Sequence, residues 1–168
     1  MALVPYNAEV LHSRCETFNF EHPQTDPKRL ANDLMLEKNL KQAYGLAANQ
    51  IGVNLRVFAF MDEVAFNPEM VNATISKELM VEGCLSYPGL WIAIERPEYI
   101  TARYYTEDGV EVERDLTGLE SRVFLHELDH LNGKTMIDHA SKFKLQRAIE
   151  KATKGGYVYS YKELRRTG

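Results

Sequence analysis

The chain has 168 residues, of which 45% are hydrophobic and 26% charged, and its formal net charge is −4. This composition is typical of one globular domain with a hydrophobic core and argues against global disorder. No apolar run approaches the roughly 20 residues that a transmembrane helix needs. The first residues show no basic stretch followed by an apolar one, so we expect no secretory signal. Two cysteines, Cys15 and Cys84, are too few for a disulfide framework, which favours a reducing compartment and a cytoplasmic location.

Charge is unevenly distributed along the chain. Residues 141–168 carry eight basic and two acidic side chains, a net charge of +6, so residues 1–140 carry −10. A basic segment on an acidic body can contact nucleic acid, although a solvated helix face is the more common explanation of such a pattern.

The first predicted element is a helix. Asp26 is suited to cap it and Pro27 to its first position, and apolar residues at positions 30, 34, 36, 40 and 44 continue the pattern as far as Gly45. Residues 55–60 are predicted to form a strand, and residues 65–68 a strand that ends at a turn. The segments 99–106 and 110–116 flank Asp108-Gly109, which strongly favours a β-hairpin.

A second helix is predicted to begin at a capping box, with Thr117 as the N-cap and Glu120 at the third helical position, and to end near Asn132-Gly133. A last helical pattern runs from Ser141 to Lys154. These elements predict one α+β domain in which antiparallel strands pack around a buried, histidine-bearing helix.

The strongest chemical signal is the H-E-x-x-H sequence of residues 126–130. Residues four apart lie one turn above each other on a helix, so His126 and His130 can bind one metal ion. Glu127 lies about 100° around the helix, which suits it to a metal-bound water rather than to the metal. Two histidines on an otherwise apolar face would be costly without such a partner.

The third ligand of a catalytic metal would decide the reaction class. A metzincin would need a histidine where this chain has Met136, and a gluzincin-like metallopeptidase would use Glu150. Cys84, between glycine and leucine in a segment expected to be extended, is the other candidate. A lone cysteine is more often a buried apolar residue, but a two-histidine helix favours a ligand.

Three segments taken together resemble the motifs of the peptide deformylase family. They are Gly45-Leu46-Ala47-Ala48-Asn49-Gln50, then Glu82-Gly83-Cys84-Leu85-Ser86, then His126-Glu127-Leu128-Asp129-His130. Their order and their separations are similar to those of that family, whose members remove the formyl group from the N-terminal formylmethionine of new proteins. The resemblance implies that residues 1–140 form the catalytic part and residues 141–168 a basic C-terminal helix and tail of the same domain.

The resemblance also implies roles for individual residues. Cys84, His126 and His130 would bind one divalent metal ion and leave its fourth position to water. Glu127 would take a proton from that water and give it to the departing amine. The Gln50 amide and the backbone N–H of Leu85 would stabilise the oxyanion.

Substrate contacts follow less directly from the motifs. The Gly45 backbone would pair with the main chain of the substrate, and Tyr44, Leu85, Leu119 and Val123 would line the methionine pocket. The chain departs from the family pattern at Ala43, where a glycine is usual. It also has Trp91 where bacterial members often have arginine, which would make the contact beyond methionine aromatic.

The family metal is usually iron(II), although one cysteine and two histidines also suit zinc, nickel or cobalt. The basic C-terminal segment resembles a ribosome-docking helix of some members, and a monomer is the simplest expectation. Two alternatives stay open at this point. One is a zincin-type metallopeptidase that uses Glu150, and the other is an inactive ribosome-binding module that keeps a structural zinc.

Overall fold

The computed structural model describes residues 2–165. Its helices are η1 (Glu9–Leu11), α1 (Pro27–Leu40), η2 (Ala48–Ile51), α2 (Gly118–Leu131), α3 (Lys142–Lys154) and α4 (Tyr161–Leu164). Its strands are β1 (Gly45–Ala47), β2 (Val57–Phe60), β3 (Glu63–Ala73), β4 (Lys77–Cys84), β5 (Tyr87–Pro97), β6 (Tyr99–Tyr105) and β7 (Glu111–Thr117).

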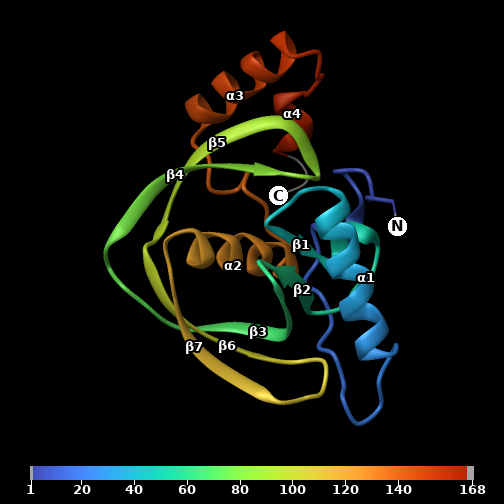
Figure 1. Ribbon diagram of the computed structural model, residues 1–168. Helices are drawn as coiled ribbons and strands as arrows, with labels where there is room; N and C mark the ends of the chain where they lie inside the picture. The colour runs from blue at the N-terminus through green and yellow to red at the C-terminus, as the bar shows by residue number, and fades with distance from the viewer. Residues whose placement is uncertain (1, 166–168) are drawn as a thin grey trace.

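The strands form two antiparallel sheets with α2 between them (Figure 1). One sheet has the order β1-β2-β3-β6-β7, and the other is the hairpin of β4 and β5. Helix α2 contacts strands of both sheets, whereas α1 covers β1 and β2 and α3 packs on β5. The predicted α+β domain built around the histidine-bearing helix is therefore confirmed.

Helix α1 begins as predicted but ends earlier. The Asp26 side chain accepts a hydrogen bond from the backbone N–H of Arg29 at 2.8 Å, and Pro27 occupies the first turn. The helix ends at Leu40, and Leu36 and Leu40 are 58% and 69% exposed rather than part of the core. The helix packs on the sheet through Leu30 and Leu34, so the apolar face is shorter than the spacing predicted.

The predicted hairpin is confirmed, whereas the end of the earlier strand was placed wrongly. Strands β6 and β7 flank Gly109, which has a φ of +74° that glycine adopts readily. Strand β3 continues through Pro68 to Ala73 instead of ending there. The register of β3 on β6 shifts next to Pro68, which has no N–H to donate, so an irregular pairing accommodates the proline inside the strand.

The capping box predicted before α2 does not form. Thr117 is the N-cap residue, but its side chain makes no capping hydrogen bond. The Glu120 carboxylate accepts a hydrogen bond from Arg114 at 2.9 Å instead of turning back to the backbone. A charged donor on the preceding strand offers a stronger partner than a backbone N–H.

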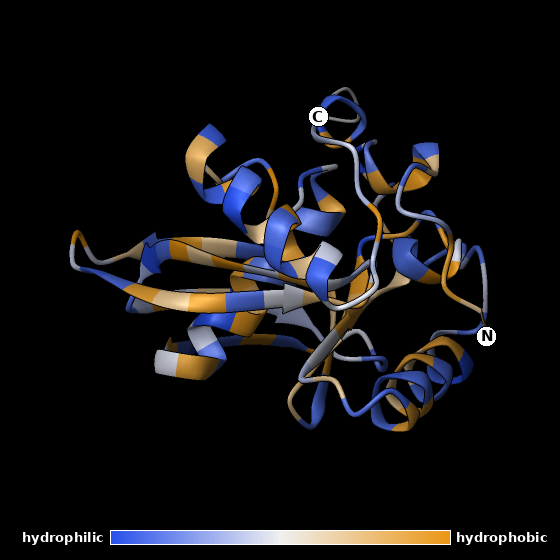
Figure 2. Ribbon diagram, turned by 90° about the horizontal axis from the view of Figure 1, so that it is seen from above, coloured by the Kyte–Doolittle hydropathy of each residue, from blue (hydrophilic) through white to orange (hydrophobic). Residues whose placement is uncertain are grey.

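Three clusters of buried apolar side chains hold these layers together. Phe124 of α2 packs edge-to-face on Phe58 and Phe60 of β2, with ring centroids 5.1 and 5.4 Å away. A second cluster lies under α1, and a third joins β5 to Leu145, Ala148 and other residues of α3. Figure 2 shows the matching alternation of hydrophobic and hydrophilic residues along the helices. No helix among residues 2–165 is long and apolar enough to cross a membrane.

Candidate active site

The three predicted metal ligands meet at the centre of the molecule. Cys84 is the last residue of β4, and His126 and His130 lie one turn apart in α2. One ligand atom from each residue lies within 4.8 Å of the other two, and Cys84 Sγ is 3.2 Å from His130 Nε2. One thiolate and two imidazoles are donors that bind transition metals well, so these residues fit a metal ion.

Glu82 orients the first histidine. Its Oε2 lies 2.9 Å from His126 Nδ1, which leaves Nε2 for a metal ion. The same carboxylate accepts hydrogen bonds from Arg96 at 2.6 and 2.9 Å and from Arg122 at 2.8 Å. Burial alone would raise the pKa of Glu82, but His126 and Arg96 lower it far below its ordinary value. Glu82 is therefore a buried, fully hydrogen-bonded carboxylate.

Cys84 is surrounded by groups that favour its thiolate. Burial opposes ionisation, but the His130 and His126 imidazoles lower the pKa of the thiol well below its ordinary value. A thiolate is the form that binds a metal ion.

Gln50 is held in one orientation beside Cys84. Its Oε1 accepts a hydrogen bond from the backbone N–H of Ala47 at 2.9 Å. Its Nε2 donates to Ser86 Oγ at 3.0 Å and lies 3.5 Å from Cys84 Sγ. Because a backbone N–H fixes the position of the oxygen, the NH₂ group must face the site. The turn of η2 and the strand β1 thus aim a hydrogen-bond donor at the metal position.

Glu127 follows His126 in α2 and lies against Gly45. The residue is 4% exposed, and its Oε2 is buried without a hydrogen-bond partner. Burial raises the pKa of Glu127 to about 7, although the neighbouring His126 and His130 lower it. A Cβ atom on Gly45 would lie 2.8 Å from the Glu127 carboxyl carbon, so only glycine fits there beside the carboxylate.

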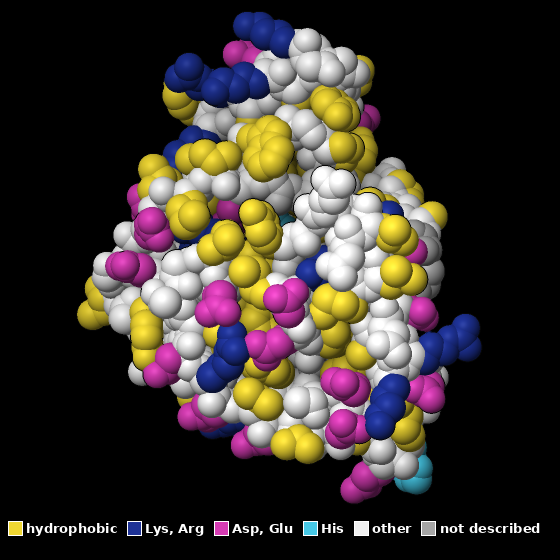
Figure 3. Space-filling model, in the orientation of Figure 1, with side chains coloured by type: hydrophobic (Ala, Val, Ile, Leu, Met, Phe, Trp, Pro, Cys, Tyr) yellow, Lys and Arg dark blue, Asp and Glu magenta, His cyan; other side chains and the backbone are white. Residues whose placement is uncertain are grey.

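A cavity of about 470 Å³ opens from these residues to the surface. The predicted substrate-binding residues Tyr44, Gly45, Leu119 and Val123 all line it, as does Leu85. Residues that the sequence did not single out also line it, among them Val81, Tyr87 and Arg122. Hydrophobic side chains gather across the middle of the face seen in Figure 3, below the hairpin of β4 and β5.

The alternative third ligand, Glu150, does not reach the site. It is exposed on α3, and the group of potential ligands found among residues 2–165 contains Cys84 with the two histidines. Helix α3 packs on β5, so its exposed side points away from α2. The alternative of a zincin-type metallopeptidase that uses Glu150 as its third ligand therefore has no support.

A buried network of charges around the ligands was not predicted. Arg96 joins Glu82 to Asp129, whose Oδ2 lies 2.7 Å from Arg96 and 2.7 Å from His139. Arg122 donates to the backbone carbonyls of Glu78 and Ile94 as well as to Glu82. One sign was available in the sequence, since Arg96 follows the alternating apolar residues Ile92 and Ile94 on the side of the strand that faces the core.

Comparison with known proteins agrees with this geometry. The family model described as polypeptide deformylase matches residues 1–146. The chain belongs to the polypeptide deformylase family. It is 39% identical to the peptide deformylase of Pseudothermotoga lettingae over 128 residues, which cover 74% of this chain and 75% of that protein. It is 37% identical to that of Desulforudis audaxviator, over 83% of this chain and 92% of that protein.

Solved peptide deformylases have the same fold. The structure from Plasmodium falciparum in complex with an inhibitor superposes with a TM-score of 0.83 at 29% identity, covering 91% of this chain and 97% of that one. The structure from Thermotoga maritima gives a TM-score of 0.78 at 31% identity, over 83% of this chain and 97% of that one.

Membership in the family establishes the reaction. The protein is a metal-dependent hydrolase that removes the formyl group from the N-terminal formylmethionine of newly made proteins, releasing formate and a free amino terminus.

Proposed function

We propose that Cys84, His126 and His130 hold the metal ion of this deformylase and that Glu127 and Gln50 act beside it. The convergence of the Cys84 thiol with two histidines of α2 carries this proposal. When bound, the metal ion would polarise the formyl oxygen and lower the pKa of a water molecule.

Glu127 is the proton carrier in this proposal. Its buried carboxylate has one oxygen without a partner, and its pKa of about 7 lets it accept and return a proton near neutral pH. It would take the proton of the attacking water and deliver it to the departing amine nitrogen of methionine. The carboxylate is nearly buried and packs against Gly45, which limits its contact with bulk water.

Two donors face the oxygen of the formyl group. Gln50 Nε2 is held toward Cys84 by the Ala47 N–H, and the backbone N–H of Leu85 follows the thiol directly. Donors fixed before the reaction stabilise the negative charge that develops on that oxygen without having to reorganise.

The peptide main chain would lie between two strands that have unpaired edges. Strand β1, which begins at Gly45, is an edge strand of its sheet. Strand β4 pairs with β5 on one side only, as far as residues 2–165 show. An extended peptide can bind such edges by backbone hydrogen bonds. The methionine side chain would then enter the cavity beside Tyr44, Leu119 and Val123.

We propose iron(II) as the metal in the cell. The support is the resemblance to the family, since the donor set itself also accepts zinc, nickel or cobalt. Metal analysis of protein purified without oxygen tests this assignment. The Cys84→Ala variant should bind far less metal, and a variant that keeps full metal content would show that the thiol is not a ligand.

Formate release from formyl-Met-Ala-Ser by the metal-loaded protein tests the residue roles. The Glu127→Gln variant should keep its metal and lose activity by roughly 10²- to 10⁴-fold, which is the usual contribution of a general acid–base group. A variant that retains full activity would remove Glu127 from the mechanism. A metal-loaded wild-type protein without activity would contradict the whole assignment.

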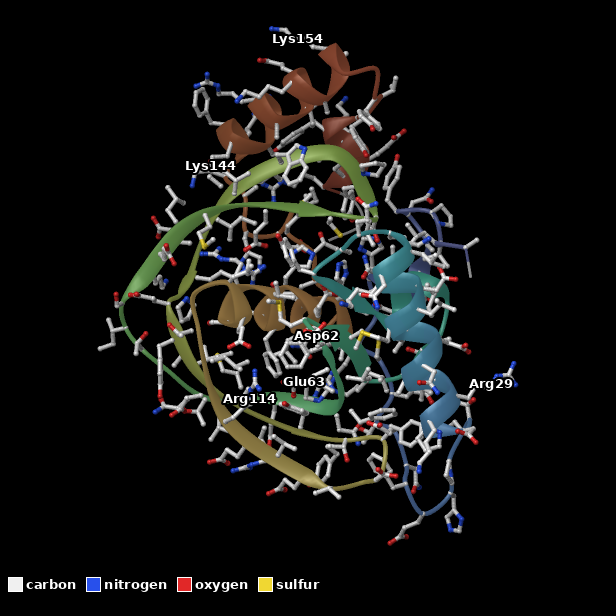
Figure 4. The ribbon with its side chains drawn as sticks, in the orientation of Figure 1. Arg29, Asp62, Glu63, Arg114, Lys144 and Lys154 are labelled. Carbon is white, nitrogen blue, oxygen red and sulfur yellow. The ribbon has the colours of Figure 1, made fainter. Side chains whose placement is uncertain are left out.

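We further propose that α3 docks on the ribosome. The helix buries Leu145, Ala148 and Ala152 against the body, and its other side is basic. Lys144 and Lys154 lie at the outside of the molecule in Figure 4. Arg166, which contributes to the charge of the predicted basic tail, lies outside the described residues. Ribosomal RNA would attract such a surface in a salt-dependent way.

Charge reversal tests this docking without removing the buried side of the helix. The triple variant Arg147→Glu, Lys151→Glu, Lys154→Glu should lose cosedimentation with ribosomes at low salt. The matched control is Lys28→Glu with Arg29→Glu, which reverses exposed charges on α1, where Arg29 points away from the body (Figure 4). Equal cosedimentation of both variants would contradict the proposal.

We also propose a cytoplasmic monomer. Cys15 and Cys84 are both free thiols, which suits a reducing compartment. Light scattering over a range of protein concentrations tests the monomer, and a mass of twice 19.3 kDa would overturn it.

A further inference from the structure

Trp91 is an exposed aromatic side chain at the wall of the active-site cavity. It lies on β5, is 64% exposed and lines the cavity. It is also the only tryptophan of the chain. An exposed tryptophan at a binding cavity offers a large, rigid apolar surface to whatever occupies the neighbouring space.

The ring of Trp91 lies across Gly83. The two residues are paired across β4 and β5, so their side-chain directions share one face of the hairpin. A Cβ atom on Gly83 would be 2.6 Å from Cζ3 of the Trp91 ring. The missing side chain therefore lets the indole cover β4 directly before Cys84.

This face of the hairpin points away from α2. Leu79 and Val81 share it with Trp91 and are 55% and 63% exposed, whereas Glu82 and Ile92 on the opposite face are buried. We call the exposed face, with Leu79, Val81 and Trp91, the outer face of the hairpin. On the inner face Glu82 is hydrogen-bonded to Arg122 of α2. Next to Gly83 the outer face carries the apolar side chains of Val81 and Trp91, whereas the exposed Glu95 lies farther along the hairpin, opposite Leu79.

A substrate peptide that pairs with the free edge of β4 as an added strand would place some of its side chains on this face. Side chains of an extended peptide alternate between the two faces of a sheet. If the formylmethionine side chain points inward to the cavity along the free edge of β4, the side chain of the second residue points outward. Gly83 has no side chain to separate that residue from the Trp91 ring.

We propose that Trp91 determines specificity for the residue that follows formylmethionine and selects large apolar or aromatic side chains there. The inference rests on the proposed placement of the peptide along β4. Aromatic contacts of this kind favour a phenylalanine over an alanine by roughly three- to tenfold in kcat/KM.

Tryptophan fluorescence tests the contact without catalysis. We expect Met-Phe-Ser, a reaction product, to change the emission of the metal-loaded protein, because its second side chain covers the indole. Met-Ala-Ser should bind at the same cavity with a smaller change. Equal changes with the two peptides would overturn the contact, even if the protein deformylates both.

Kinetics with matched variants test the selectivity. The ratio of kcat/KM for formyl-Met-Phe-Ser over formyl-Met-Ala-Ser should fall to about 1 in Trp91→Ala and be partly restored in Trp91→Phe. The control Leu79→Ala removes an exposed apolar side chain from the same outer face farther from Gly83, and its ratio should equal that of the wild type. A ratio unchanged in Trp91→Ala would overturn the proposal. A wild-type protein inactive on both peptides would instead contradict the residue roles proposed for catalysis.

Discussion

Glu82 Oε2 lies 2.9 Å from His126 Nδ1, and this contact links the strand that carries Cys84 to the helix that carries both histidines. Two arginines hold the same carboxylate, so the position of one metal ligand depends on a buried network of charges. Such outer partners fix the ring orientation and raise the affinity of a histidine ligand for metal.

Replacing Glu82 should weaken both metal binding and stability. The Glu82→Gln variant should bind metal roughly 10- to 100-fold more weakly, because the His126 ring loses its charged acceptor. Arg122 would also lose its carboxylate partner and Arg96 would keep only Asp129, which costs up to about 3–5 kcal/mol of unfolding free energy. Competition with a chelator and urea denaturation measure the two effects. Glu95→Gln, an exposed change on β5, is the control, and equal values for both variants would contradict this role of Glu82.

Gln50 and Ser86 should differ in their effect on the reaction. Gln50→Ala removes the side-chain donor and should lower kcat by roughly 10²- to 10³-fold with the metal content unchanged. Ser86→Ala removes only a partner of the Gln50 amide, and the Ala47 N–H still orients it, so a loss of about tenfold or less is expected. Steady-state kinetics measure both effects. A lower kcat in Ser86→Ala than in Gln50→Ala would contradict these roles.

Gly45→Ala should displace the general base without unfolding the protein. The new methyl group would overlap the Glu127 carboxylate, which is nearly buried and cannot move freely away. We expect kcat to fall by roughly 10²-fold or more. The largest fall possible is to the kcat of an enzyme without its general base. Gly155→Ala, at the end of α3 and outside the set of residues that line the cavity, is the control. Full activity in Gly45→Ala would show that catalysis does not need the close packing of Glu127 against Gly45.

The two cysteines should react differently with iodoacetamide. Burial raises the pKa of Cys15 to about 11, and the residue is 3% exposed, so few thiolates are present at pH 8. Cys15 alkylation in the folded protein should therefore stay slow and rise as the pH approaches 11. Cys84 should be labelled in metal-free protein and protected after metal is added. Peptide mapping by mass spectrometry distinguishes the sites, and Cys84 labelling that ignores added metal would argue against ligation by this thiol.

Local sequence determined the elements that carry the site. The Asp108-Gly109 turn fixed the hairpin of β6 and β7, and the H-E-x-x-H spacing placed two histidines one turn apart on a helix. These predictions succeeded because they depend on residues close together in the chain, whose geometry follows from turn type and helical period. The capping box predicted at Thr117 does not form, because Arg114 of the preceding strand donates a hydrogen bond to the Glu120 carboxylate. That contact could not be predicted from the helix sequence alone.

Only the tertiary structure decided which distant groups meet. The sequence by itself left Cys84 and Glu150 as competing third ligands, and the packing of the β4–β5 hairpin over α2 brought the thiol to the histidines. The same packing joined Glu82 to Arg96 and Arg122 and laid Trp91 over Gly83. A buried charge needs a partner, but its identity depends on contacts between segments dozens of residues apart, and these exist only once the layers have packed.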